Sequence, residues 1–405
     1  MNTLLVPVAT EADPLARRRA LTGILEHAVA SLELTDKQRE SVESTYKEVG
    51  AHLAKALKYG QPQGDIFPQG SYRLGTVIRP WRDITDVFDL DVVFRLIVPA
   101  AGQDAKKYRE AVGEHLREKY NGVVKPLPKG WRLDYSKERD YYLDIIPAMD
   151  AVQRSAGVIA ITDASQWRDS NPRGFGDWFA DISKLLPRFG LIAIANSAEF
   201  ESRHASIEPL PEHTDFKSPL QRITQISKRF RDYHFNKKLN TPKHAPASIV
   251  LTTLLAKSYQ RCVGARTYES GYDLLVECVK GMPDFLRVTL DLHKRAAFTL
   301  ENPSLPTENL VAKWNDDPSL AKAFYDWHGQ YIALLTLLPE DKAPQRKLLE
   351  DTLGKDPVKV AYQRQIESMN AARNAAALKV VPKFGLTASA AAGVVVPNLT
   401  IHGNK

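Results

Sequence analysis

The sequence of 405 residues predicts an α+β protein, in which a sheet-containing first half precedes a helical second half. Three patterns predict this fold class. Residues 36–58 form one long amphipathic pattern, apolar strand-like segments follow at 89–98 and 139–146, and helical periodicity dominates after residue 176. We therefore expect a mixed or antiparallel sheet that lies beside an α-helical lobe.

Capping signals and periodicity justify the elements of the first half. Thr35 to Gln38 has the form of a capping box, in which Thr35 caps a helix and Gln38 reaches back to the cap. The helix that follows should end at the Gly-Pro turn near residue 60. The other elements expected in this half are helices at 15–31 and 105–120 and strands at 131–135 and 155–162.

Proline and glycine separate the helical segments of the second half. The helices expected there are 177–186, 219–235, 246–263, 269–278, 284–297, 306–314, 317–337 and 357–372. The tail is rich in Ala, Gly and Val, and we expect it to be extended or mobile. The expected division is a first lobe at 1–200 that includes the long helix, a helical lobe at 201–378 and a tail at 379–405.

The composition narrows the class of protein. Hydrophobic residues make up 43% and charged residues 25%, as in ordinary globular proteins, and no apolar run reaches the roughly 20 residues that span a membrane. The first residues do not have the order of charges of a signal peptide. Cys262 and Cys278 form neither a CxxC pair nor a zinc pattern, so we expect a cytoplasmic protein with reduced thiols. The net charge of +7 favours a polyanionic partner.

Two acids stand one residue apart inside an apolar strand pattern. Residues i and i+2 of a strand share a face, so Asp89 and Asp91 should lie side by side while Leu90 and Val92 enter the core. Asp144 is a single acid in a second apolar strand, and a buried carboxylate needs a partner. If the two strands are neighbours, three carboxylates converge and can hold two divalent metal ions.

Alternatives to a metal site remain open at this point. Asp-x-Asp is a common pattern, and acids at strand ends often lie in solvent. Asp83 and Asp86 are competing acids in a loop-like stretch, and Asp140 could reach the site if the strand around Asp144 is short.

A glycine-punctuated loop precedes these acids. Gly70 allows backbone N–H groups to approach an anion closely, and the Ser71 hydroxyl adds a donor. A Gly-Ser pair is usually a plain turn. A Gly-Ser pair shortly before Asp-x-Asp on an apolar strand is far more specific, and it predicts a phosphate-binding loop.

These residues carry a family resemblance. Gly70-Ser71, then Asp89 and Asp91, then Asp144 on a later strand, resemble the polymerase-β-like nucleotidyltransferases. Within that superfamily, the segment 69–76 resembles the bacterial cGAS/DncV-like nucleotidyltransferases (CD-NTases), which make cyclic oligonucleotide signals in anti-phage (CBASS) defence. Segments 219–232 and 301–314 extend the resemblance over roughly residues 35–330. It implies a polymerase-β-like core with an α-helical lobe and an active site in the cleft between them.

The resemblance also implies roles for single residues. Asp89, Asp91 and Asp144 would be the catalytic residues and would hold two Mg²⁺ or Mn²⁺ ions, and Asp144 would help to deprotonate the attacking hydroxyl. Gln69, Gly70 and Ser71 would contact donor phosphates. Residues 1–200 would then be the catalytic lobe.

The segment 219–235 can be interpreted without the family. Its apolar stripe should be buried, with Lys228 and Arg231 on a neighbouring polar face and Arg222 and Arg229 in solvent. A lysine at the edge of an apolar stripe most often only covers it with its methylene groups. The resemblance makes Lys228 the triphosphate lysine.

Ser248 stands where a helix is expected to begin, after Pro246. It could serve for capping or packing, or it could present its hydroxyl to phosphate. The resemblance favours the phosphate role. Lys257 and Arg203 are weaker phosphate candidates, Trp314 and Trp327 are expected core residues, and four histidines are expected in loops or on the surface: His204, His213, His234 and His244.

The function that the resemblance implies is condensation of nucleoside triphosphates, with ATP and GTP expected, into a cyclic di- or trinucleotide second messenger. The alternatives are an RNA-tailing or linear oligoadenylate-forming enzyme of the same superfamily, a catalytically dead nucleotide-binding protein, and a toxin that modifies macromolecules. The chain has no zinc-binding Cys/His insertion like that of the animal DNA sensor, so long nucleic acid is not expected as a partner. The expected partners are nucleoside triphosphates and a regulatory or conjugating protein at the C-terminus.

Overall fold

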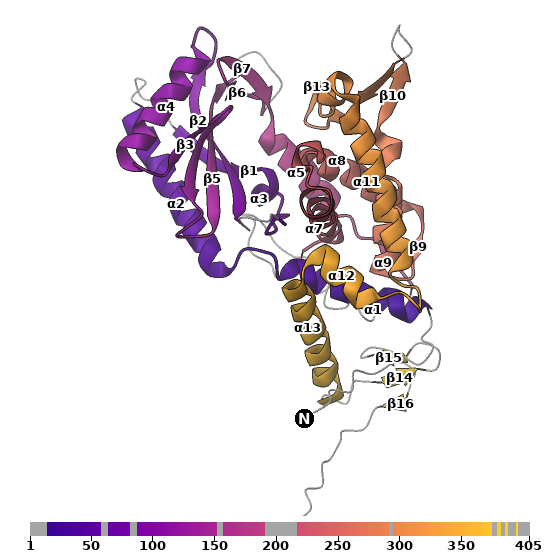
Figure 1. Cartoon of the computed structure of the whole chain (residues 1–405). Helices are drawn as coiled ribbons and strands as arrows, with labels where there is room; N and C mark the ends of the chain where they lie inside the picture. Colours follow the sequence, from indigo (N-terminus) through magenta and orange to yellow (C-terminus); the bar gives the residue numbers. More distant parts are fainter. Residues whose placement is uncertain are drawn as a thin grey trace, which may run out of the picture.

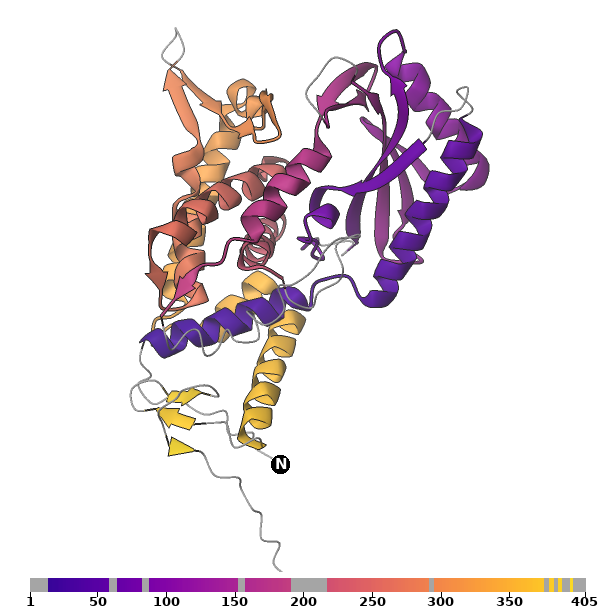
Figure 2. The same cartoon turned by 180° about the vertical axis from the view of Figure 1, so that it is seen from behind.

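The computed structural model describes residues 14–57, 64–81, 87–151, 157–190, 217–290, 295–374, 379–381, 385–387 and 394–395. A twisted sheet with two covering helices lies beside a group of helices, and the two parts are visible from both sides (Figures 1 and 2). This arrangement confirms the predicted α+β fold class. No helix among the described residues combines the length and apolar character needed to cross a bilayer.

The sheet has seven strands and is mixed. Strand β2 pairs in parallel with β5, and every other neighbouring pair is antiparallel. The spatial order of the first five strands is β1 (Gly64–Gln69), β2 (Phe88–Pro99), β5 (Tyr141–Asp150), β4 (Gly130–Tyr135) and β3 (Val124–Leu127), and β5 also pairs with β6 (Ile159–Asp163), which pairs with β7 (Gln166–Ser170).

Two amphipathic helices cover one face of this sheet: α2 (Asp36–Ala56) and α4 (Ala105–Lys119). The expected capping box at Thr35 is present at the start of α2. The alternation along β2 sends Leu90 and Val92 into the core beneath these helices, in one cluster with Leu143 of β5. The acids of β2 therefore point to the other face of the sheet.

The helical part forms a second, separate hydrophobic core. The first helix of the chain, α1 (Pro14–Ala30), packs in this core, although the expected lobe at 1–200 includes it. The division of the chain at residue 200 thus remains a proposal. The other long helices of this part are α5 (Pro172–Ser183), α7 (Pro219–Asp232), α8 (Ser248–Ala265), α9 (Gly271–Lys280), α11 (Pro318–Leu337), α12 (Gln345–Leu353) and α13 (Lys355–Asn374).

The structure differs from the expected elements in two segments. A helix was expected at 284–297, but a hairpin of β10 (Arg287–Leu290) and β11 (Ala296–Thr299) follows a single 3₁₀ turn (Met282–Phe285). The expected helix 306–314 is instead β13 (Leu305–Asn309), paired with β12 (Glu301–Asn302) and followed by the short α10 (Ala312–Asp316). β-branched residues in the hairpin, Val288 and Thr289, favour strand over helix.

The remaining elements are short. They are α3 (Gly70–Arg73), a 3₁₀ turn at Pro242–His244, the parallel pair β8 (Arg188–Phe189) and β9 (Thr267–Tyr268), and a three-stranded sheet in the tail made of β14 (Lys379–Val381), β15 (Gly385–Thr387) and β16 (Val394–Val395). Trp314 and Trp327 lie in the helical core, as expected.

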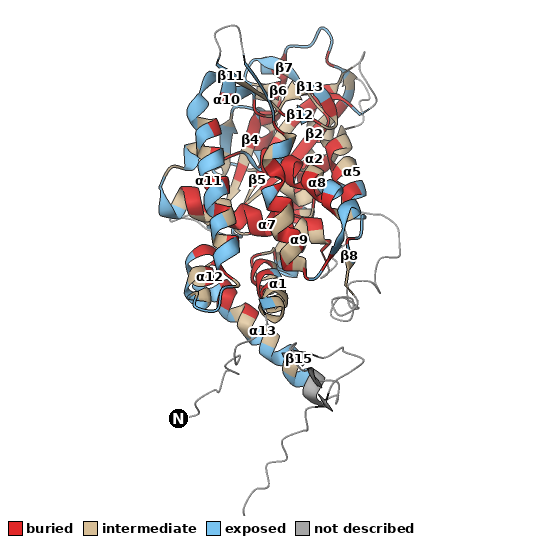
Figure 3. Cartoon of the chain, turned by 90° about the vertical axis from the view of Figure 1, so that its right-hand side faces the viewer, coloured by how far each residue is buried: buried red, intermediate tan, exposed pale blue. Residues whose placement is uncertain are grey.

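Helix α7 is central, and two predictions about its charges are wrong. Figure 3 shows that it is buried along most of its length. Arg222 and Arg229, which were expected in solvent, are buried. Arg222 donates to Glu33 at 2.8 Å, and Arg229 donates to the Leu353 carbonyl, because chain segments before and after α7 cover its far side. Arg229 also stacks on Trp81.

The predicted position of His234 in a loop or on the surface is also wrong. This residue lies in the π-helix Tyr233–Lys238 that continues α7, and it is buried. Burial, followed by the positive charge of Lys238, lowers the pKa of His234 to about 4. The imidazole is therefore neutral at physiological pH and acts as a core residue.

Candidate active site

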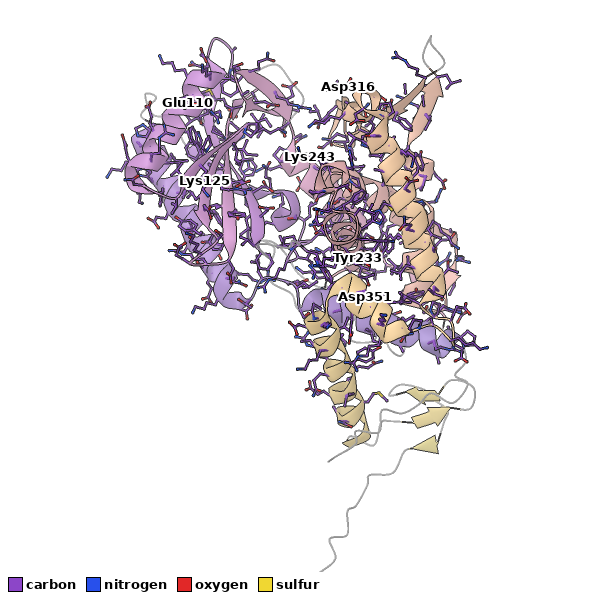
Figure 4. All side chains as sticks on the ribbon, in the orientation of Figure 1. Glu110, Lys125, Tyr233, Lys243, Asp316 and Asp351 are labelled. Carbon is purple, nitrogen blue, oxygen red and sulfur yellow. The ribbon has the colours of Figure 1, made fainter. Side chains whose placement is uncertain are left out.

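The three predicted acids come together on the open face of the sheet. Asp89 and Asp91 project from β2 on the side opposite to α2 and α4. Because β2 and β5 are parallel, Asp91 lies directly opposite Asp144 in the register. The expectation that both strands are neighbours is thus met, and the side chains of all three acids share one face. Figure 4 draws the side chains of the sheet, on which Lys125 is labelled, and of the helical part, in which Tyr233 is labelled.

An arginine from a neighbouring strand links two of these acids. Arg132 lies on β4 opposite Asp144. Its Nε donates to Asp144 Oδ1 at 2.7 Å and its Nη2 to Asp144 Oδ2 at 2.8 Å, and Nη2 also lies 3.2 Å from Asp89 Oδ1. The Tyr142 ring lies 4.2 Å from the guanidinium carbon. The sequence analysis missed Arg132, because only strand pairing brings it beside the acids.

The three carboxyl groups lie close enough together that a negative charge on one disfavours ionisation of another. Burial, together with the charges of Asp144 and Asp89, raises the pKa of the Asp91 carboxyl to about 7. Burial also raises the pKa of Asp144, although the hydrogen bonds from Arg132 act in the opposite direction. Converging carboxylates with raised pKa values are typical of sites that bind a cation or handle protons.

The described residues contain no preformed group of three acidic, His or Cys side chains with the geometry of a metal site. The contacts of Arg132 explain this: oxygens of Asp89 and Asp144 point to its guanidinium. The donor set nevertheless fits a hard divalent cation, because it consists of carboxylate oxygens from three acids that a single guanidinium offsets only in part.

The glycine-serine loop lies directly beside Asp91. Gln69, the last residue of β1, is the register partner of Asp91, and the chain then turns into the short helix α3. Gly70 makes this turn with a φ of 57°, and a Cβ there would lie 2.9 Å from Asp91 Oδ2. Ser71 is the next residue, on α3. The structure thus places Gln69, Gly70 and Ser71 next to the acids.

Lys228 reaches this loop from α7. It is buried, and its Nζ donates to the Thr76 carbonyl at 3.0 Å. Burial and the nearby charge of Arg231 lower the pKa of Lys228 to about 8, while Asp91 and Asp89 act to raise it. The effect of Asp91 and Asp89 on its pKa shows that the ammonium group lies within electrostatic range of these two acids.

Ser248 is the first residue of α8 and is exposed. Its Oγ accepts a hydrogen bond of 2.9 Å from Arg231 Nη1. Arg231 is the second residue that the sequence analysis did not assign to the site. Its position three residues after Lys228, on the same helical face, was the signal that could have found it. Arg231 also donates from Nε and Nη2 to Asp232 Oδ1, so its guanidinium contacts that carboxylate as well as the Ser248 hydroxyl.

The other candidates of the sequence analysis do not join the site or fall outside the described residues. Asp140 is exposed, and its backbone carbonyl accepts from the Phe88 N–H at 3.0 Å. This residue therefore contributes a backbone hydrogen bond at the start of β2. Lys257 is a partly exposed residue in the middle of α8. Asp83, Asp86, Arg203, His204 and His213 lie outside the described residues.

Comparisons with known proteins agree with this geometry. The model of the Second Messenger Oligonucleotide or Dinucleotide Synthetase domain matches residues 21–182. A c-di-GMP synthase of Roseivirga ehrenbergii is 29% identical over 363 residues, which are 87% of this chain and 89% of that protein.

Solved structures show the same fold. The Bradyrhizobium diazoefficiens CD-NTase CdnG in complex with GTP aligns with a TM-score of 0.63 at 18% identity, over 84% of this chain and 96% of that one. The CdnC:HORMA-deltaN complex of E. coli MS115-1 aligns with a TM-score of 0.55 at 12% identity, over 80% and 93% of the two chains.

The mixed sheet and the adjoining helices match the polymerase-β-like fold of the CD-NTases, and the three convergent acids and the glycine-serine loop lie together in it. Within this class, the domain match over residues 21–182, the c-di-GMP synthase relative and the fold of CdnG support a cGAS/DncV-like nucleotidyltransferase, a CD-NTase. The resemblance on which the sequence analysis relied is thereby confirmed.

Proposed function

We propose that this chain condenses nucleoside triphosphates into a cyclic di- or trinucleotide second messenger and releases pyrophosphate. The observation that carries the proposal is the convergence of Asp89, Asp91 and Asp144 beside the loop at Gly70. The likeness to a c-di-GMP synthase over most of the chain supports a cyclic product and GTP as one substrate. By family, the product would act in bacterial anti-phage (CBASS) defence.

We assign the acids to divalent metal binding, with two Mg²⁺ or Mn²⁺ ions. CD-NTases generally use divalent metals, and the carboxylate set of Asp89, Asp91 and Asp144 fits such ions. Bound metal would supply positive charge that neutralises the triphosphate and activates the attacking hydroxyl. The β2–β5 pairing holds the three carboxylates on one face, so their positions are set before substrate binds.

The phosphates of the donor nucleotide would lie between the loop and α7. Gln69 and Ser71 are suited to donate hydrogen bonds to phosphate oxygens, and the backbone at Gly70 allows close approach. Lys228, Arg231 and Ser248 would hold the outer phosphates with charge and a hydroxyl. These contacts would keep the α-phosphorus in line with the acceptor hydroxyl.

In the bond-forming step, a ribose 2′- or 3′-hydroxyl of one nucleotide attacks the α-phosphorus of the next. The bond from that phosphorus to the pyrophosphate oxygen breaks, and the pyrophosphate leaves. Asp144 would help to take up the hydroxyl proton, the role that the family resemblance implies for it. A second round of the same step closes the ring of a dinucleotide, and a trinucleotide needs a third.

The test is incubation with all four triphosphates and Mg²⁺, followed by mass spectrometry of the products. We expect a cyclic product from the wild type and none from the double variant Asp89→Asn/Asp91→Asn, because loss of both carboxylates removes the metal site. Unchanged product in the double variant would refute the proposal. Extension of an added RNA primer in place of cyclic product would favour the RNA-tailing alternative.

A partner protein remains part of the proposal. The CdnC structure is that of a complex with a HORMA protein, which supports the idea that regulatory proteins bind enzymes of this fold. We assign such a partner, or a conjugating one, to the C-terminus. Residues 396–405 lie outside the described residues. The enzyme is proposed to act in the cytoplasm.

A further inference from the structure

Arg132 is held in place from three sides. Strand pairing sets it opposite Asp144, whose two carboxylate oxygens accept from Nε and Nη2 at 2.7 and 2.8 Å. The ring of Tyr142 lies against its guanidinium at 4.2 Å. Nη2 also approaches Asp89 Oδ1 at 3.2 Å. This is a fixed cation that bridges two acids from two strands.

The same two acids are the ligands that we propose for metal. Two carboxylates this close repel each other unless a positive charge lies between them. A divalent metal can supply that charge, and so can a guanidinium, whose planar fork matches carboxylate oxygens. Both cations need the same oxygens, so they cannot be bound independently.

We propose that Arg132 is a positioning residue that serves as the internal counter-ion of the catalytic acids and competes with the divalent metal for Asp89 and Asp144. The inference rests on the proposed function, since it assumes that these acids hold the metal. Without metal, Arg132 keeps the acids converged. With metal bound, its guanidinium gives up part of its contact.

The geometry indicates which contact opens first. Arg132 is bonded to both oxygens of Asp144, whose side chain is 12% exposed, whereas it approaches only one oxygen of Asp89, at a longer distance, and that side chain is 35% exposed. The Asp89 contact is therefore the weaker and more accessible one. Metal binding should displace Arg132 from Asp89 more readily than from Asp144.

The competition predicts an effect that a merely structural arginine would not have. Arg132→Gln should lower the melting temperature of the metal-free protein, because two carboxylates lose their counter-ion. It should also make Mn²⁺ binding to the nucleotide-free protein tighter by roughly tenfold, since metal no longer has to displace a cation. Arg132→Lys keeps the charge without the fork, and an intermediate affinity is expected.

Arg95 offers a matched control. It lies on β2 in the same sheet, is 21% exposed against 23% for Arg132, and also bridges two acids, with Asp65 at 3.1 Å and Asp150 at 3.5 Å. These acids are not part of the proposed metal site. Arg95→Gln should lower the melting temperature of the metal-free protein but leave the Mn²⁺ affinity unchanged.

The experiment measures free Mn²⁺ by electron paramagnetic resonance during titration of each full-length protein without nucleotide, and the melting temperature with and without Mn²⁺. Tighter binding in Arg132→Gln, with a larger Mn²⁺-induced rise of melting temperature than in Arg95→Gln, supports the inference. If Arg132→Gln does not fold, Arg132→Lys carries the test. Affinities equal to or weaker than wild type in the Arg132 variants overturn it.

Failure of the proposed function gives a different result. In that case the Mn²⁺ binding of the wild type does not depend on Asp89 and Asp91, and the variant Asp89→Asn/Asp91→Asn binds as well as the wild type does. That outcome contradicts the metal site and the inference together. Binding that requires the acids but ignores Arg132 contradicts the inference alone.

Discussion

At the scale of single residues, Gly70 shows how closely the loop and the acids are fitted. Its φ of 57° is in the left-handed region, and a Cβ would meet Asp91 Oδ2 at 2.9 Å. In Gly70→Ala we expect stability to fall by about 1–2 kcal/mol from the backbone strain. We expect activity to fall by about 100-fold, because the methyl group displaces the carboxylate of Asp91, for which we propose a catalytic role.

Gly102 is the control for this prediction. It has a φ of 78°, but a Cβ there has no neighbour within 4 Å. Gly102→Ala should therefore lose a similar amount of stability while keeping its rate of product formation. Chemical denaturation and initial rates of pyrophosphate release measure the two effects. Equal rates for both variants would contradict the role assigned to the Gly70–Asp91 contact.

At the scale of elements, the first turn of α7 connects the helical part to the glycine-serine loop. Ser218 Oγ accepts from the Gln221 N–H at 3.2 Å, and Gln221 Oε1 accepts from the Ser218 N–H at 2.8 Å. The amide nitrogen of Gln221 donates to the Leu74 carbonyl at 2.9 Å. One capping box thus fixes the helix start and the end of the loop together.

Loss of this cap should affect substrate binding as well as stability. Ser218→Ala is expected to cost about 1 kcal/mol of stability and to raise the KM for the triphosphate several-fold, since the first turn of α7, which holds Gln221 against Leu74, loses its cap and frays. Ser270→Ala removes the comparable N-cap of α9, where Ser270 Oγ accepts from the Asp273 N–H at 3.2 Å. That control should lose similar stability without a change in KM; steady-state kinetics and thermal unfolding distinguish the two variants.

At the scale of the whole molecule, the two largest hydrophobic cores among the described residues draw on segments that are not contiguous in sequence. One lies between the sheet and α2 and α4, and the other lies among the helices and includes α1 from the start of the chain. The site lies where the open face of the sheet meets α7 of the second core. Each core therefore supports one side of the proposed active site.

The two cores should respond separately to cavities. Leu21 of α1 and Leu116 of α4 are both fully buried, but in different cores. Each leucine-to-alanine substitution is expected to cost about 2–5 kcal/mol. Hydrogen exchange should become faster in α7 and α11 for Leu21→Ala, and in β2 and β5 for Leu116→Ala. The same exchange pattern in both variants would contradict two separate cores.

The sequence by itself determined the local features of this protein. Strand alternation determines that Asp89 and Asp91 share a face, the capping box at Thr35 begins α2, and the Gly70-Ser71 turn stands before the acids. These features follow from backbone geometry over a few residues, so a pattern in the sequence reports them directly.

Only the tertiary structure decided which distant residues meet. The parallel pairing of β2 with β5 sets Asp91 opposite Asp144, and β4 adds Arg132 between the acids. The burial of Arg222 depends on Glu33, which lies far away in the sequence. Periodicity shows which face of an element is apolar, but the register of a strand and the partner of a buried charge depend on contacts between distant segments. The acids of the site were therefore predictable from the sequence, whereas the arginine that holds two of them together was not.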